Sequence, residues 1–179
     1  MPSFTTMLAR MAFPHPTRHS PYRYATFVGV RLGIFNAVTA AIAINLMLAL
    51  FPLEKLGPSA AAFISNYNTL GVFFLGVIFI PFFETFIAQL LPLELARGVG
   101  LNDRACIATG AALFGFTHYL NGGIAHGICA TIGGAVFSMA YIKIRPWGYM
   151  PSYWASSIAH GTNNFLIFFV APLILPDIG

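Results

Sequence analysis

The stretch from residue 69 to 91, TLGVFFLGVIFIPFFETFIAQLL, decides the fold class of this chain. Its apolar residues form a continuous run, and the run is longer than the roughly 20 residues that a helix needs to cross a bilayer. A transmembrane strand would be about half as long and would alternate apolar with polar residues. Glu84 is the one charged residue in the stretch. The stretch 69–91 therefore predicts a transmembrane helix that carries a carboxylate inside the membrane.

The rest of the chain has the same character. Of its 179 residues, 58% are hydrophobic and 8% are charged, whereas about 25% are charged in an ordinary soluble domain. This composition excludes a soluble globular protein. Four more apolar segments are predicted as helices, at residues 25–51, 105–119, 124–142 and 153–175. We therefore expect an all-α integral membrane protein with about five transmembrane helices, in a single membrane domain over residues 25–179.

Residues 1–24 differ from this domain, because they combine arginines with several prolines and lack a long apolar core. They are predicted to form a cytoplasmic arm and not a removable signal peptide. Phe4, Met7, Leu8 and Met11 follow helical spacing, so the arm is expected to begin with a short interfacial helix.

Basic residues give the expected orientation. If all five segments cross the membrane, Lys55 falls on one side and seven basic residues fall on the other: Arg10, Arg18, Arg23, Arg97, Arg104, Lys143 and Arg145. The positive-inside rule then places the N-terminus in the cytoplasm, in a bacterial-type inner membrane. Because topology accounts for the basic residues, no nucleic-acid partner is expected.

Three ionisable side chains lie inside predicted helices, where lipid offers them no polar partner: Glu84, His118 and His160. The other four acidic residues fall in predicted loops or in the tail. Asn164 shares a helix face with His160, and Phe114 shares one with His118, because residues four apart are neighbours on a helix. Since a polar group in hydrocarbon costs several kcal/mol, we expect the three ionisable residues to meet in one interior cavity.

A structural role is the alternative for each of these residues. A protonated glutamate or a lone histidine can join two helices by a hydrogen bond. Three such residues on three helices, with Asn163 and Asn164 beside His160, favour a functional site instead. The depths of the three residues along their helices argue against a shared site. A rise of about 1.5 Å per residue places Glu84 and His160 roughly 10 Å deep, but His118 near 20 Å.

The motifs FFETFIAQ around Glu84, FGFTH ending at His118, and HGTNN from His160 to Asn164 resemble the CAAX protease and bacteriocin-processing (CPBP/Abi) family. Its members are glutamate-dependent intramembrane endopeptidases and include CAAX prenyl proteases of the Ras-converting type. They carry E-E-x-x-x-R, F-x-x-x-H and H-x-x-x-N or H-x-x-x-D on successive helices. The resemblance covers about residues 69–175, and it implies that the last four helices form a catalytic core.

The first motif departs from the family pattern. Thr85 stands in place of the second glutamate, and Gln89 stands in place of the arginine. These positions are one helical turn apart, so the family residues can form an ion pair within the helix. Both charges are lost together here, which leaves the net charge of the pair unchanged and avoids an uncompensated buried charge. We interpret the pair as a variant of the motif in which Thr85 and Gln89 support the site.

Peptide hydrolysis requires an activated water, a stabilised oxyanion and a proton for the leaving amine. The resemblance implies that Glu84 is the general base and that His118 orients the attacking water. His160 and Asn164 would then donate to the oxyanion, while Phe114 and Asn163 support them. The expected substrate is a peptide or protein at the membrane, prenylated or of the bacteriocin type. No cofactor and no metal are expected, and membrane lipid is the other expected partner.

Two other classes of function stay open. One glutamate and two histidines match the ligand types of a zinc-dependent membrane hydrolase, although H-E-x-x-H spacing is absent. The chain could also be a non-enzymatic immunity or partner-binding protein, or a small carrier that uses Glu84 as its proton site.

Overall fold

The computed structural model describes residues 20–58 and 62–174, and every regular element within them is helical. The expected all-α fold is confirmed. The proposed interfacial helix near Phe4 and Met11 lies outside the described residues. The first long helix begins at Pro21, four residues before the expected start at Ala25. Proline suits the first turn of a helix, because its missing N–H would have no partner there.

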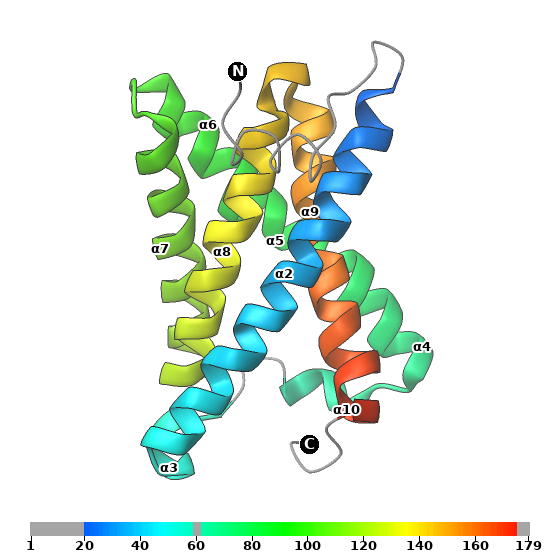
Figure 1. Cartoon of the computed structure of the whole chain (residues 1–179), viewed down its shortest axis with the longest axis vertical. Helices are drawn as coiled ribbons and strands as arrows, with labels where there is room; N and C mark the ends of the chain where they lie inside the picture. Colours follow the sequence, from blue (N-terminus) through cyan, green and yellow to red (C-terminus); the bar gives the residue numbers. More distant parts are fainter. Residues whose placement is uncertain (1–19, 59–61, 175–179) are drawn as a thin grey trace, which may run out of the picture.

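Five helical segments make up the fold (Figure 1). The first is α2 (Pro21–Leu50), and the second is continuous from Thr69 to Gly98. This second segment consists of α4 (Thr69–Val72), η2 (Phe73–Phe79), α5 (Ile80–Thr85), η3 (Phe86–Leu90) and α6 (Leu91–Gly98). Helix α7 (Asp103–Asn121) and helix α8 (Ile124–Ile144) form the third and fourth. The last consists of α9 (Tyr149–Phe165), η5 (Leu166–Val170) and α10 (Ala171–Ile174).

Short elements connect these segments. Helix α3 (Leu53–Leu56) and the 3₁₀ turn η1 (Ala62–Asn66) lie between α2 and α4, and the 3₁₀ turn η4 (Arg145–Trp147) joins α8 to α9. The start of α2 and the connections α6–α7 and α8–α9 lie at one end of the molecule, whereas α3 and α10 lie at the other (Figure 1). The described residues of the expected cytoplasmic group therefore gather at one end, and Lys55, in α3, is at the opposite end.

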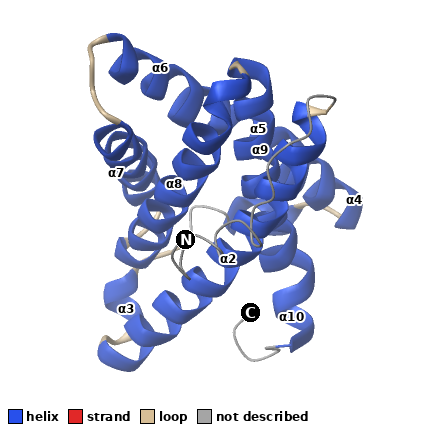
Figure 2. Ribbon diagram, turned by 45° about the horizontal axis from the view of Figure 1, so that its top comes forward, coloured by secondary structure: helices blue, strands red, loops and turns tan. Residues whose placement is uncertain are grey.

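Helix α2 packs directly against α9 through two glycines with G-x-x-x-G spacing. A Cβ atom on Gly29 would lie 2.6 Å from the carbonyl oxygen of Ala155, and one on Gly33 would lie 2.5 Å from that of Ala159. Small residues at this spacing let two helix backbones approach closely within a membrane. The contact fixes the middle of α2 beside the turn that carries His160, and the all-helical packing is visible in Figure 2.

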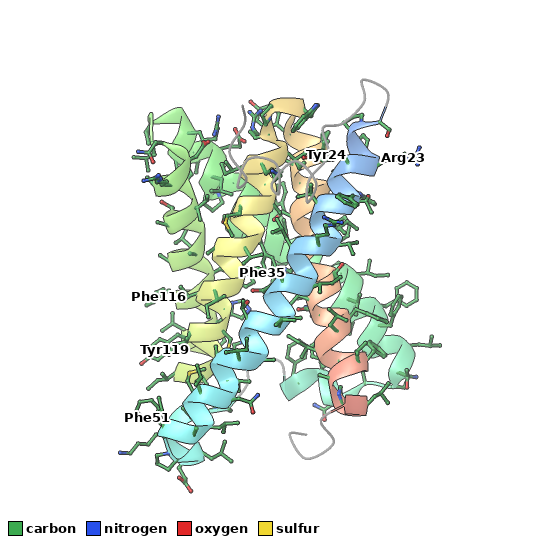
Figure 3. The ribbon with its side chains drawn as sticks, viewed as in Figure 1. Arg23, Tyr24, Phe35, Phe51, Phe116 and Tyr119 are labelled. Atoms are coloured by element: carbon green, nitrogen blue, oxygen red, sulfur yellow. The ribbon has the colours of Figure 1, made fainter. Side chains whose placement is uncertain are left out.

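The outer surface of the helices is apolar, as the bilayer requires. Phe35, Phe51, Phe116 and Tyr119 lie on the outside of α2 and α7 (Figure 3), and each is at least half exposed. Among the described residues, three helices are long and apolar enough to cross a membrane: Pro21–Leu50, Thr69–Gly98 and Ile124–Trp147. The chain is an integral membrane protein. Crossing by α7 and by α9, and hence the total of five crossings, stays a prediction.

Candidate active site

Glu84 lies on a segment in which α-helical turns alternate with π-helical ones. The π-helical stretches η2 and η3 stand on either side of α5, the short helix that holds Glu84 and Pro81. The backbone N–H of Ile80 donates to Leu75, five residues back. Pro81 has no N–H to continue this ladder to Gly76, so the Gly76 carbonyl is left for another donor.

The structure brings Glu84, His118 and His160 together from α5, α7 and α9. The Oε2 atom of Glu84 is 3.8 Å from Nε2 of His118 and 3.7 Å from Nε2 of His160. The side chain of Glu84 is 33% exposed, against 18% for His118 and 5% for His160. Both distances exceed a direct hydrogen bond and lie within the reach of one bridging water. The carboxylate is thus open enough for a substrate and close enough to share a water.

His118 is held in one orientation. Its Nδ1 atom lies 2.8 Å from the carbonyl oxygen of Phe114, one turn earlier in α7. Because a carbonyl only accepts, Nδ1 carries the proton, and in the neutral ring Nε2 offers its lone pair toward Glu84. The ring of Phe114 lies 4.2 Å from the imidazole, centroid to centroid. The Nε2 atom of His118 is therefore an acceptor for a hydrogen bond from the direction of Glu84.

His160 is held by aromatic packing and not by the backbone. Its ring stacks on Phe137 of α8 at 4.5 Å and meets the edge of Phe114 at 5.3 Å, centroid to centroid. Its Nδ1 atom is buried and has no hydrogen-bond partner among the described residues. Since nothing in that region fixes its tautomer, Nε2 can present a proton toward the site.

Asn164 bonds to the helix that carries Glu84. Its Nδ2 donates to the Gly76 carbonyl at 2.8 Å, which is the oxygen that Pro81 leaves without its backbone donor. Its Oδ1 accepts from Nδ2 of Asn163 at 3.0 Å. A Cβ on Gly161 would lie 2.7 Å from the Val77 carbonyl, so a glycine is needed for this approach. Asn164 lies one turn from His160, and the Gly76 bond uses one of its two amide protons.

Thr85 follows Glu84 directly and Gln89 lies five residues after it, and both are completely buried, with 0% exposure. The Thr85 hydroxyl and both polar atoms of the Gln89 amide have no hydrogen-bond partner among the described residues. The support of the site by Thr85 and Gln89 stays a prediction, and no side-chain hydrogen bond carries it within this part of the chain.

Two aromatic rings of the site were not singled out by the sequence. Phe137, 1% exposed, stacks on His160, and His126 stacks on His118 with 5.1 Å between ring centroids. A histidine near the start of an apolar segment is a signal that could have drawn attention to His126. Phe137 carries no such signal, because it is one phenylalanine among 18. No group of three or more His, Cys, Asp or Glu residues in residues 20–58 and 62–174 is arranged to hold a metal ion.

Comparison with known proteins identifies a family that this sequence matches. Residues 66–166 match the model of the family described as type II CAAX prenyl endopeptidase Rce1-like, and this range contains Glu84, His118, His160 and Asn164. No curated protein and no solved structure gives a significant match. The match covers more than half of the chain and includes the three helices whose polar residues meet. The chain therefore belongs to the type II CAAX prenyl endopeptidase Rce1-like family, whose members are intramembrane endopeptidases.

Proposed function

We propose that this protein is a glutamate-dependent intramembrane endopeptidase that needs no metal ion and cleaves a peptide bond of a membrane-associated substrate. The observation that carries the proposal is the position of the Glu84 carboxylate, 3.8 Å and 3.7 Å from two imidazoles on two other helices. Family membership supports the peptidase class.

The reaction begins with a water held between Glu84 and His118. Glu84 removes one proton as the water oxygen attacks the carbonyl carbon of the peptide bond, and Nε2 of His118 accepts a hydrogen bond from the other proton. The Nδ1–H···O bond to Phe114 supports this role, because it leaves the Nε2 lone pair facing Glu84. The C=O double bond becomes a C–O⁻ single bond in the tetrahedral intermediate.

His160 and Asn164 then stabilise the oxyanion. An N–H of His160 at Nε2 and the second proton of the Asn164 amide donate to it from one face of α9. The intermediate collapses when the C–N bond breaks, and the proton held by Glu84 passes to the leaving nitrogen. The products are a carboxylic acid and an amine, which exchange one proton to give a carboxylate and an ammonium group, and Glu84 returns to its starting charge.

The substrate class follows from where the site opens. Glu84 is one-third exposed on a helix whose surface is apolar, so a substrate anchored in the membrane can reach it without leaving the bilayer. The family description supports a prenylated peptide as the first candidate, and a bacteriocin-type peptide is the second. The N-terminus is proposed to lie in the cytoplasm, in a bacterial-type inner membrane.

The test compares the peptide termini in membranes that contain the wild-type protein with those in membranes that contain Glu84→Gln. Glutamine is nearly isosteric with glutamate but cannot take the proton. We expect at least one new terminus that appears only with the wild-type protein. Glu94→Gln is the matched control, because Glu94 lies on the same continuous helix and pairs with Arg145. The proposal fails if purified Glu84→Gln protein cleaves that substrate as fast as the wild type.

Two further measurements separate the alternatives. Loss of cleavage in a chelator, with recovery on adding zinc, would favour a metal-dependent hydrolase with Glu84 and the two histidines as ligands. Proton movement driven by a gradient, with no cleavage by the purified protein, would favour a carrier. We expect neither result.

A further inference from the structure

Three asparagines form a chain of hydrogen bonds that connects α2 to the helix of Glu84. Asn36 Nδ2 donates to Asn163 Oδ1 at 2.9 Å, and Asn163 Nδ2 donates to Asn164 Oδ1 at 3.0 Å. Asn164 Nδ2 then donates to the Gly76 carbonyl at 2.8 Å. This series of hydrogen bonds thus begins on α2, passes through α9 and ends two turns before Glu84.

The direction of this chain is fixed at its far end. A backbone carbonyl only accepts, so Asn164 must turn its NH₂ group toward Gly76 and its oxygen toward Asn163. Asn163 must therefore donate to Asn164, which turns its own oxygen toward Asn36. The Asn163 oxygen therefore needs a hydrogen-bond donor, and the NH₂ group of Asn36 supplies it.

Asn36 occupies a position built for this contact. It is 2% exposed, and a Cβ on Gly133 of α8 would lie 3.3 Å from its Nδ2 atom. Gly33, one turn earlier, brings α2 against the backbone of α9. Asn45, on the same helix, gives the contrast, because it is exposed and donates to Ala41, one turn earlier in α2.

We infer that Asn36 is a positioning residue for the peptidase site, which acts by holding Asn164 with its NH₂ group presented as a donor. The inference rests on the proposed function for its catalytic consequence. Residue 36 lies outside the range that the family model matches, so the role is assigned by the contacts of α2. Without the Asn36 donor, the Asn163 oxygen loses its partner and the Asn163 amide is held on one side only, which loosens the contact that orients the Asn164 oxygen.

The kinetic test uses Asn36→Leu, which keeps the size of the side chain and removes its donor. We expect kcat for a prenylated CAAX peptide to fall about 10-fold, with KM changed by less than about 2-fold, because the lost group acts on the oxyanion and not on substrate binding. Asn36→Asp, which offers only acceptors in its ionised form, should lower kcat at least as much. Asn45→Leu is the matched control and should leave kcat unchanged.

A double-mutant cycle separates positioning from general structural support. In an Asn164→Ala background, Asn36→Leu should change kcat by less than about 2-fold, because the residue through which it acts is already gone. If Asn36→Leu lowers kcat about 10-fold in that background as well, or has no effect in the wild type, the inference is overturned.

A second readout does not depend on activity. The side-chain amide resonance of Asn164 in detergent-solubilised protein is assigned by its loss in Asn164→Ala, and we expect Asn36→Leu to shift it while Asn45→Leu does not. This shift in a protein without peptidase activity would support the amide chain and contradict the proposed function. Glu84-dependent cleavage with no shift and no kinetic change in Asn36→Leu would overturn the inference and leave the proposed function standing.

Discussion

The second helical segment, from Thr69 to Gly98, carries two carboxylates that differ in their hydrogen-bond partners. Glu94 is fully paired, because Arg145 binds both of its oxygens and Tyr141 donates to Oε1 at 2.7 Å. Glu84 has imidazoles at 3.7 Å and 3.8 Å but no hydrogen bond at normal distance within residues 20–58 and 62–174. Paired groups lock helices together, whereas a carboxylate that lacks a close partner stays available for a substrate or a water.

The neighbours of the two carboxylates differ in the same way. Arg145 lies over the ring of Tyr149 at 3.8 Å, so the Glu94 cluster also includes a cation–π contact. Around Glu84, by contrast, Thr85, Gln89 and Nδ1 of His160 are buried without partners among the described residues. Most buried polar groups in proteins are hydrogen-bonded, and exceptions often mark functional sites. The contrast supports our proposal that the Glu94 cluster serves stability and the Glu84 cluster serves chemistry.

The largest expected effect comes from removing the free carboxylate. Glu84→Gln should lower kcat by about 10⁴-fold or more, because Glu84 is the group that takes the proton of the attacking water, whereas His118 orients that water. Cleavage of a prenylated CAAX peptide by purified protein measures it, with thermal unfolding in detergent as the check that the fold is intact. Glu94→Gln should keep most of the activity. Equal losses of activity in the two variants would remove the distinction between the clusters.

A smaller loss is expected when one oxyanion donor is removed. Asn164→Ala should lower kcat by roughly 10² to 10³-fold, as for a lost donor in an oxyanion hole. It should also lower the unfolding temperature, because the Gly76 carbonyl loses its partner. The same assay at saturating substrate measures kcat. A variant that loses stability but retains full kcat would reduce Asn164 to a purely structural residue.

Restoring the family pair next to Glu84 sharpens the comparison. Thr85→Glu or Gln89→Arg alone places one unpaired charge at a position with 0% exposure, and each should cost about 3 kcal/mol of unfolding free energy. The double change should cost less than either single change, since the two charges are one turn apart and can pair. Unfolding of the four proteins in a denaturing detergent tests this, and strictly additive losses would contradict it.

The smallest effect on activity is expected at the paired cluster. Arg145→Leu leaves Glu94 without its cation and should lower the unfolding free energy by about 2 kcal/mol, less than for a fully buried pair because both side chains are about one-fifth exposed. Its kcat should stay within about 3-fold of the wild type. Arg145→Leu combined with Glu94→Leu should recover part of the stability. A loss of kcat as large as that of Asn164→Ala would show that the Glu94 cluster also serves the reaction.

The sequence by itself determined the class of protein and the identities of the polar residues. Continuous apolar runs have one solution in lipid, because the backbone must satisfy its own hydrogen bonds, and this predicts helices with bounds close to those observed. Helix ends were less certain. The second helix continues to Gly98 and places Glu94, expected in a loop, on α6. Glu84, His118 and His160 were identifiable because ionisable residues are rare in such runs.

Only the tertiary structure decided how these residues meet. Counting the helical rise leaves His118 about 10 Å deeper than Glu84, yet the two side chains are 3.8 Å apart. The depth of a side chain depends on how helices are offset against one another, which no single helix encodes. The role of Asn36 could not be predicted from the sequence for the same reason. Its partner lies 127 positions away, and packing of α2 against α9 through Gly29 and Gly33 is what brings the two amides together.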